Sequence, residues 1–131
     1  MRIRGTKRRG VASVELAFCL PVIVIIVLGA LSATSLIFMR QAVVQSAYET
    51  IKEAIRTDGT VEEALVRGNE VLNFRNITPS SIVFDPTDPE SAPRGTPVTV
   101  TIRAGIEENQ FYSFGPFISR TVEVSSTMVK E

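Results

Sequence analysis

The feature that most constrains the fold is a run of 24 residues, Leu16 to Met39, that contains no charged side chain. As one helix this run would be about 36 Å long, enough to cross a hydrocarbon core of about 30 Å. A helix that is apolar on every side would otherwise need a large core around it, and the 91 residues after Arg40 are too few to supply one. We therefore predict a transmembrane helix over residues 11–39, with the lipid bilayer as its surroundings.

The charges on either side of this run predict its orientation. The chain has 14 basic and 14 acidic residues, but its first nine positions hold five basic residues and no acidic one. These residues are Arg2, Arg4, Lys7, Arg8 and Arg9. Fewer lie in the first turns after the run, namely Arg40, Lys52 and Arg56. Because Lys and Arg are retained on the cytoplasmic side, we expect residues 1–10 to form a basic leader inside the cell and residues 40–131 to lie in the periplasm.

The composition argues against most catalytic and nucleic-acid-binding functions. The chain has no His, one Cys and no Trp, so it lacks Ser-His-Asp and Cys-His pairs, zinc sites built on His and internal disulfides. Residues 11–131 hold nine basic and 14 acidic residues, a net charge of −5, which disfavours nucleic acid as a partner. We expect a protein that is not an enzyme and has no cofactor or metal. A membrane-bound hydrolase that uses loop carboxylates is the weakest alternative.

The junction between the leader and the apolar run has the features of a processing site. It reads RRGVASVEL from Arg8 to Leu16. Gly10 presents no side chain to a protease and has low helix propensity, so a helix that begins near Val11 would leave it accessible and extended. A cut after Gly10 would create an α-amine at Val11. Glu15 would then lie one turn into the helix, where the helix dipole favours a carboxylate by a few tenths to about 1 kcal/mol.

This junction resembles the cleavage site of type IV prepilins, in which a prepilin peptidase cuts after the glycine and the glutamate becomes the fifth residue of the mature chain. Residues 8–56 as a whole are similar to the TadE-like family of minor pseudopilins from Tad (tight adherence) pilus systems. The features that carry the resemblance are Arg8-Arg9-Gly10, Val14-Glu15-Leu16, Leu20-Pro21, Gly29 and Arg40-Gln41-Ala42. Residues 121–131 also resemble the final strand of that family.

The resemblance implies a minor pseudopilin of a Tad-type type IV pilus or a related secretion filament, anchored in the bacterial inner membrane. It also implies processing between Gly10 and Val11 and an assembly role for Glu15, which in type IV pilins pairs with the amine of a first residue. The implied partners are a prepilin peptidase, other pilins or pseudopilins, and Tad membrane assembly proteins.

A secretory signal peptide is the alternative for the N-terminus. Ala30-Leu31-Ser32 fits a small-x-small cleavage site. A cut there would release an exported, β-rich binding domain that begins at Ala33. However, the apolar run continues through residues 36–39 beyond that cut, and it follows directly on the acidic Glu15.

Two positions inside the predicted span point to helix packing. Pro21 removes one backbone hydrogen bond and tends to kink a helix, which membrane helices tolerate when neighbours compensate. Gly29 opens a zone of small residues that extends to Ser35 and would let another helix approach closely.

After Arg40 the pattern predicts a small α+β domain. The first helix continues to about Arg56 with apolar residues at helical spacing, and Asp58-Gly59 stops it. These apolar residues are Val44, Ala47, Tyr48, Ile51, Ala54 and Ile55. A capping box at residues 60–63 opens a second helix, in which Gly68 weakens the prediction of continuity, and Pro79 closes the helical part.

Three alternating segments then predict a small antiparallel sheet of about three strands packed on the helices. They are residues 82–84, 98–104 and 121–128. Residues 85–97 hold four prolines and are expected to form an exposed linker. Calcium bound by Asp85, Asp88 and Glu90 is the disfavoured alternative.

The connection before the last strand is rich in aromatic residues. Phe111, Tyr112, Phe114 and Phe117 fall within seven positions. We expect them either to cover the open end of the sheet or to form a contact with a neighbouring subunit.

Overall fold

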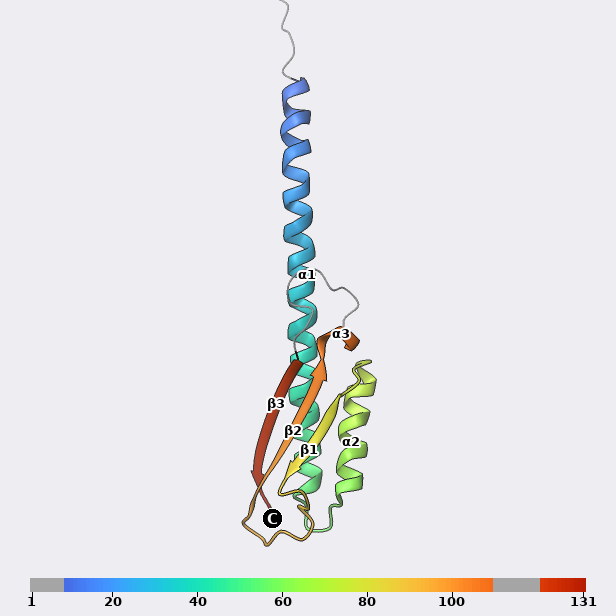
Figure 1. Cartoon of the computed structure of the whole chain (residues 1–131), viewed down its shortest axis with the longest axis vertical. Coiled ribbons are helices and arrows are strands. Elements are labelled where there is room, and N and C mark those ends of the chain that lie inside the picture. Colours follow the sequence, from blue (N-terminus) through green and yellow to red (C-terminus); the bar gives the residue numbers. More distant parts are fainter. Residues whose placement is uncertain (1–8, 110–120) are drawn as a thin grey trace, which may run out of the picture.

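A computed structural model describes residues 9–109 and 121–131 and shows an α+β fold. A long helix α1 (Arg9–Ala54) is followed by α2 (Val61–Phe74), β1 (Ser81–Asp85), β2 (Pro97–Gly105), the short helix α3 (Ile106–Asn109) and β3 (Thr121–Val129). The first part of α1 projects beyond the other elements, which pack around its second part (Figure 1). The predicted order of long helix, short helix and three strands is confirmed.

The core lies between one face of α1, the inner side of α2 and one face of the sheet. On α1 it begins at Met39 and continues in helical steps through Val43, Ala47 and Ile51, all at most 3% exposed. Residues 10–27, by contrast, are exposed along their whole length. The same helix therefore meets two different environments, with the change of environment close to Arg40.

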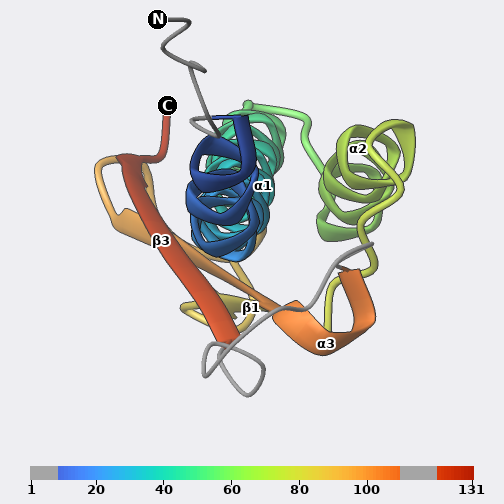
Figure 2. The ribbon, with the colours of Figure 1, turned by 90° about the horizontal axis from the view of Figure 1, so that it is seen from above.

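The sheet has the order β1-β2-β3, and both pairs are antiparallel. In the central strand β2 the alternating side chains of Val98, Val100, Ile102 and Ala104 are fully buried. Seen along the helix axis, α1 lies over the concave side of the sheet and α2 lies beside α1 (Figure 2). The edge strand β3 has the same alternation, but its inward side chains are only half-buried, since β3 has a neighbouring strand on one side where β2 has one on both.

The face of the sheet that points away from α1 carries paired polar side chains. The hydroxyl groups of Thr99 and Thr127 lie 2.8 Å apart, and those of Thr101 and Ser125 lie 2.9 Å apart. Arg103 Nε lies 3.0 Å from Glu123 Oε2, and the hydrogen bond between the two side chains raises the pKa of Arg103. These cross-strand pairs fix the register of β2 and β3 on the exposed face.

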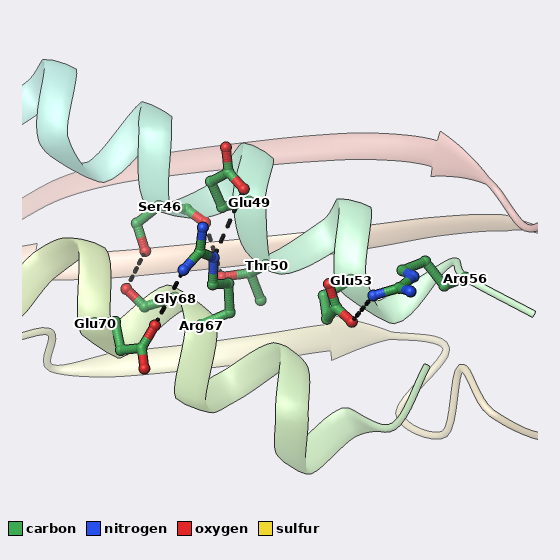
Figure 3. A network of polar contacts seen from close by, with 8 residues as sticks. All are labelled: Ser46, Glu49, Thr50, Glu53, Arg56, Arg67, Gly68 and Glu70. Atoms are coloured by element: carbon green, nitrogen blue, oxygen red, sulfur yellow. Dashed lines mark hydrogen bonds and ion pairs between the residues drawn. The ribbon is translucent and has the colours of Figure 1, made fainter. Parts of the chain in front are cut away.

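The α1–α2 contact is close because small and hydroxylated residues face each other across it. Gly68 of α2 is buried against Ser46 and Thr50 of α1. Ser46 Oγ donates to the carbonyl oxygen of Gly68 at 2.8 Å, and Thr50 Oγ1 donates to the carbonyl oxygen of Ser46 at 2.7 Å (Figure 3). The expected weakness of α2 at Gly68 is thus not seen, because the missing side chain allows the close approach of the two backbones.

Salt bridges run along the edge of this contact. Arg67 Nη1 lies 3.2 Å from Glu70 Oε2, and Arg67 Nε lies 3.9 Å from Glu49 Oε2 on α1. All three side chains are partly exposed, so these pairs contribute at most about 1 kcal/mol each.

The predicted start of α2 after Thr60 is confirmed. Thr60 is the N-cap, and its side chain accepts a hydrogen bond from the Glu63 amide at 3.2 Å. At the other end, Asn76 has a φ of 53°, and the Ile77 amide donates to the carbonyl oxygen of Leu72 at 3.0 Å. The left-handed Asn76 and this hydrogen bond end α2 at Phe74, five residues before Pro79, which was expected to end the helical part.

The segment between β1 and β2 is mostly exposed, as predicted, but contacts near its middle anchor it to the rest of the domain. Pro89 is fully buried, and Lys130 Nζ donates to the carbonyl oxygens of Pro89 and Glu90. The carboxylate of Glu90 accepts a hydrogen bond from the Val61 amide at the start of α2. In the described residues no three acidic, Cys or His side chains gather as metal ligands. Glu90 instead joins the segment to α2.

Two residues that the pattern placed in the core lie outside it. Val44 and Tyr48 are 47% and 48% exposed. The buried stripe on α1 is shifted around the helix and includes Ser46 and Thr50, which a search for apolar residues does not select. The helix ends at Ala54, two residues earlier than predicted.

Candidate assembly helix

The N-terminal end of α1 carries the predicted processing site. The helix begins at Arg9, so Gly10 lies inside its first turn. The expectation that Gly10 is extended is therefore wrong, since the helical hydrogen-bonding pattern begins before Val11. Apart from its chain neighbours and the local helix backbone, no heavy atom of the described residues lies within 4 Å of the place where a Cβ of Gly10 would be, and Gly10 and Val11 are both exposed. A protease could reach this bond after unwinding a single helical turn.

Glu15 lies on α1 four residues after Val11, so the two residues share a face of the helix. Its side chain is exposed, and within residues 9–109 and 121–131 no ion pair involves it. In a helix that began at Val11, the free amine would stand one turn from this carboxylate. The geometry would therefore let Glu15 meet its own amine or a cation of a neighbouring chain.

The interior of the predicted span is a continuous helix. α1 passes through Pro21 without interruption, and Gly29 has open space where a side chain would be. Beyond Gly29 the hydroxyl groups of the span donate back to carbonyl oxygens four residues earlier: Ser32 to Leu28 at 3.0 Å and Thr34 to Ala30 at 2.8 Å. These hydroxyls are satisfied inside the helix, as a lipid environment requires.

An open face of α1 continues from the span into the domain, on the side away from the core. It contains a shallow surface hollow of about 560 Å³. The hollow is lined by Ile37, Arg40, Gln41, Val44, Gln45 and Tyr48. Gln45 is held by Arg75, the residue that follows α2, whose Nη2 donates to Gln45 Oε1 at 3.1 Å. Sequence analysis missed this face, although Val44 and Tyr48 were recognised as apolar residues of the helix.

Some predicted site residues fall outside the described residues. These are the leader up to Arg8 and the aromatic residues Phe111, Tyr112, Phe114 and Phe117. The aromatic segment lies between Asn109, the last residue of α3, and Thr121, the first residue of β3.

Together these features define a class of protein. One exposed apolar helix, long enough to cross a bilayer, continues without a break into a small α+β domain, which fits a single-pass membrane protein.

Comparison with protein families narrows this class. The family model described as TadE-like protein matches residues 10–51. The resemblance to a Tad pilus component is thus confirmed for the segment from Gly10 to Ile51. The match spans nearly all of α1 and none of α2 or the sheet, so it does not extend to the predicted similarity of residues 121–131. The comparisons with curated proteins and with solved structures gave no match.

Proposed function

We propose that this protein is a minor pseudopilin, a structural and assembly component of a Tad-type type IV pilus or a related secretion filament. One observation carries the proposal: the segment that matches the TadE-like family is the helix that the domain leaves uncovered on one face. Residues 10–27 are all exposed, and the open face beyond them includes Val44 and Tyr48. A helix of this kind is suited to pack beside the helices of other subunits.

In this proposal the chain is first inserted with its leader in the cytoplasm and its domain in the periplasm. The proposed location is the bacterial inner membrane. A prepilin peptidase then cuts after Gly10 and removes all five leader charges. The product is an apolar helix that begins with the α-amine of Val11, which is mostly protonated at neutral pH.

Glu15 then serves assembly. A carboxylate at the membrane edge gains most from a cationic partner when packed helices exclude water from it. The cation we propose is the Val11 amine, of the same chain or of a neighbouring pilin or pseudopilin. Tad membrane assembly proteins are the other expected partners. Phe111, Tyr112, Phe114 and Phe117 remain proposed contacts to a neighbouring subunit.

The N-terminal mass of the chain from its native membrane tests the processing step. We expect a mature chain that begins at Val11. A chain that begins at Ala33 would establish the signal-peptide alternative. Both products would keep the buried residues of α1 from Met39 onward, so the mass of the N-terminus is the measurement that separates them.

Gly10→Val sharpens this test. Because no packed side chain of the described residues lies near the missing Cβ, the substitution should not disturb that part of the fold, and an uncut precursor would report on the peptidase. Gly29→Val is the matched control, since Gly29 is equally open and lies in the same helix, and it should leave the cut unchanged. Normal processing of Gly10→Val would contradict the proposed site.

Glu15→Ala tests the assembly step. The variant should be inserted and folded, because an apolar residue only lengthens the span, but it should be lost from purified pilus complexes. Glu15→Asp keeps the charge and should retain part of the association. If Glu15→Ala purified with its partners as the parent does and supported normal piliation, the proposed pairing would be wrong.

A further inference from the structure

The strand β3 is an open edge of the sheet in the described part of the chain. It contains nine residues, none of them proline or glycine, and β2 is its one strand neighbour. β1, at the other edge, has five residues and is followed directly by Pro86. Natural sheets protect their edges by short strands, prolines, bulges and charges. Such protection is present at β1 and nearly absent at β3, whose single formal charge, Glu123, is paired with Arg103.

The backbone of β3 can be assigned residue by residue to its two sides. The Lys130 amide donates to the Thr96 carbonyl oxygen at 3.0 Å, so the backbone of Lys130 points toward β2. Hydrogen bonding alternates along an antiparallel strand, and the register pairs Met128 with Val98 and Ser126 with Val100. The even-numbered residues therefore bond to β2. The N–H and C=O groups of Glu123, Ser125 and Thr127 point to the open edge.

The two faces of β3 define the side chains that a further strand would need. On the α1 side the half-buried residues are Val122, Val124, Ser126 and Met128. On the other side Thr127 and Ser125 are already paired with threonines of β2. A strand added at this edge would continue both faces if it alternated apolar side chains toward α1 with hydroxylated or other uncharged side chains away from it.

Another copy in the same membrane does not fit this edge well. Because β3 runs alongside α1 (Figure 1), and α1 has one direction in all copies that share a topology, the β3 strands of two copies are parallel. The two β3 edges can meet only if one copy is rotated by half a turn about the α1 direction. This rotation also reverses the faces of its sheet, so the apolar face of one copy would adjoin the polar face of the other. Pairing with β1 of a copy keeps the faces, but only Ile82 and Phe84 would present outward backbone groups there.

We propose that the open edge of β3 binds an extended segment of a different protein, which runs antiparallel to β3 and adds a fourth strand to the sheet. The segment alternates apolar and uncharged polar residues and lies on the same side of the membrane as the domain. Its main-chain hydrogen bonds to Glu123, Ser125 and Thr127 supply affinity, and its apolar side chains beside Val122 and Val124 supply specificity. The proposal requires that α1 crosses a membrane and does not require a role in a pilus.

Amide hydrogen exchange tests it directly. The full chain is compared in two preparations, purified alone in detergent and captured with its associated proteins from native membranes. The amides of Glu123, Ser125 and Thr127 should exchange at least tenfold more slowly in the native preparation. Those of Val124 and Ser126 bond to β2 and should be slow in both, which provides an internal control. Equal exchange of the outward amides in the two preparations would overturn the proposal. Protection of these amides in the purified protein alone would also overturn it, because two copies of the chain would then be paired along β3.

Ser125→Pro supplies the second arm, because it removes an outward N–H and the hydroxyl bond to Thr101 but leaves the backbone bonds to β2 in place. Exchange at Glu123 and Thr127 in the native preparation should then rise to the rate of the protein alone. Ser125→Ala, which keeps the N–H and loses only the hydroxyl bond to Thr101, should retain the protection. A folded Ser125→Pro chain with full protection would contradict the proposal, and if this variant does not fold, the comparison of the two wild-type preparations decides. The N-terminal mass, which tests the pilus role, is independent of both results.

Discussion

Substitution of Gly68 gives the most stringent test of the contact between α1 and α2. A Cβ at this position would lie 2.1 Å from Thr50 Oγ1 and 3.4 Å from both Ser46 Oγ and Thr50 Cβ. Real Cβ atoms essentially never approach a heavy atom closer than 3.0 Å, so the first contact must open by about 0.9 Å. Thr50 cannot rotate freely to relieve it, because Thr50 is fully buried and its hydroxyl donates to the Ser46 carbonyl oxygen.

Two opposing terms set the effect of Gly68→Ala on the free energy of unfolding. Alanine favours a helix over glycine by about 1 kcal/mol. Overpacking a tight contact costs about 1–3 kcal/mol. We therefore expect a net loss of about 1 kcal/mol. Thr50→Ala removes the oxygen that the new methyl group would meet, so in the double variant Gly68→Ala should become neutral or stabilising.

The quantity to measure is the coupling between the two substitutions, obtained from urea unfolding of the full chain in detergent. We expect a coupling of about 1–3 kcal/mol in favour of the double variant. Val66→Ala compared with Val66→Gly measures the propensity difference at an exposed position of the same helix. If the effects of Gly68→Ala and Thr50→Ala simply add within about 0.5 kcal/mol, the close contact described for α1 and α2 is wrong.

Three other predictions follow from the same structure. Val100→Asp should lower the free energy of unfolding by about 3–5 kcal/mol, and Val124→Asp should lower it clearly less, because Val100 is fully buried and Val124 is half-buried. Equal losses of stability in thermal unfolding would contradict the described orientation of the β3 side chains. Thr60→Ala should cost about 1 kcal/mol in urea unfolding through loss of the N-cap of α2, and Thr60→Ser should restore most of it. A reporter fused after Glu131 should be active only outside the cytoplasm, and activity in the cytoplasm would reverse the proposed topology.

The parts of the fold that depend on local sequence could be predicted. The apolar run, the N-cap at Thr60 and the alternation in β2 can each be read from neighbouring residues, and the structure has all three where the pattern placed them. The helix cap at Asn76 also acts locally, but it rests on one residue with positive φ. The prediction relied on Pro79 instead and therefore placed the end of the helical part five residues after Phe74, where α2 ends.

The parts that depend on what packs against a residue could not be predicted. Gly68 lowers helix propensity when it is considered alone, and its benefit exists only because Ser46 and Thr50 approach it from α1. Pro89 belongs to a proline-rich stretch, yet it is buried, and Lys130 donates to its carbonyl oxygen from 41 positions away in the sequence. Contacts of this kind leave no periodic pattern to detect.

The error at Val44 and Tyr48 has a physical cause that bears on function. A helix that packs only against its own domain needs one apolar stripe, and a search for helical spacing assumes that this stripe is the core. α1 has two, since Val43, Ala47 and Ile51 face the sheet and α2, while Val44 and Tyr48 lie on the open side. The second stripe extends the exposed apolar surface of the predicted span past Arg40 into the domain. The domain does not use it, which is the arrangement expected if α1 has a further helix to contact in the assembled state.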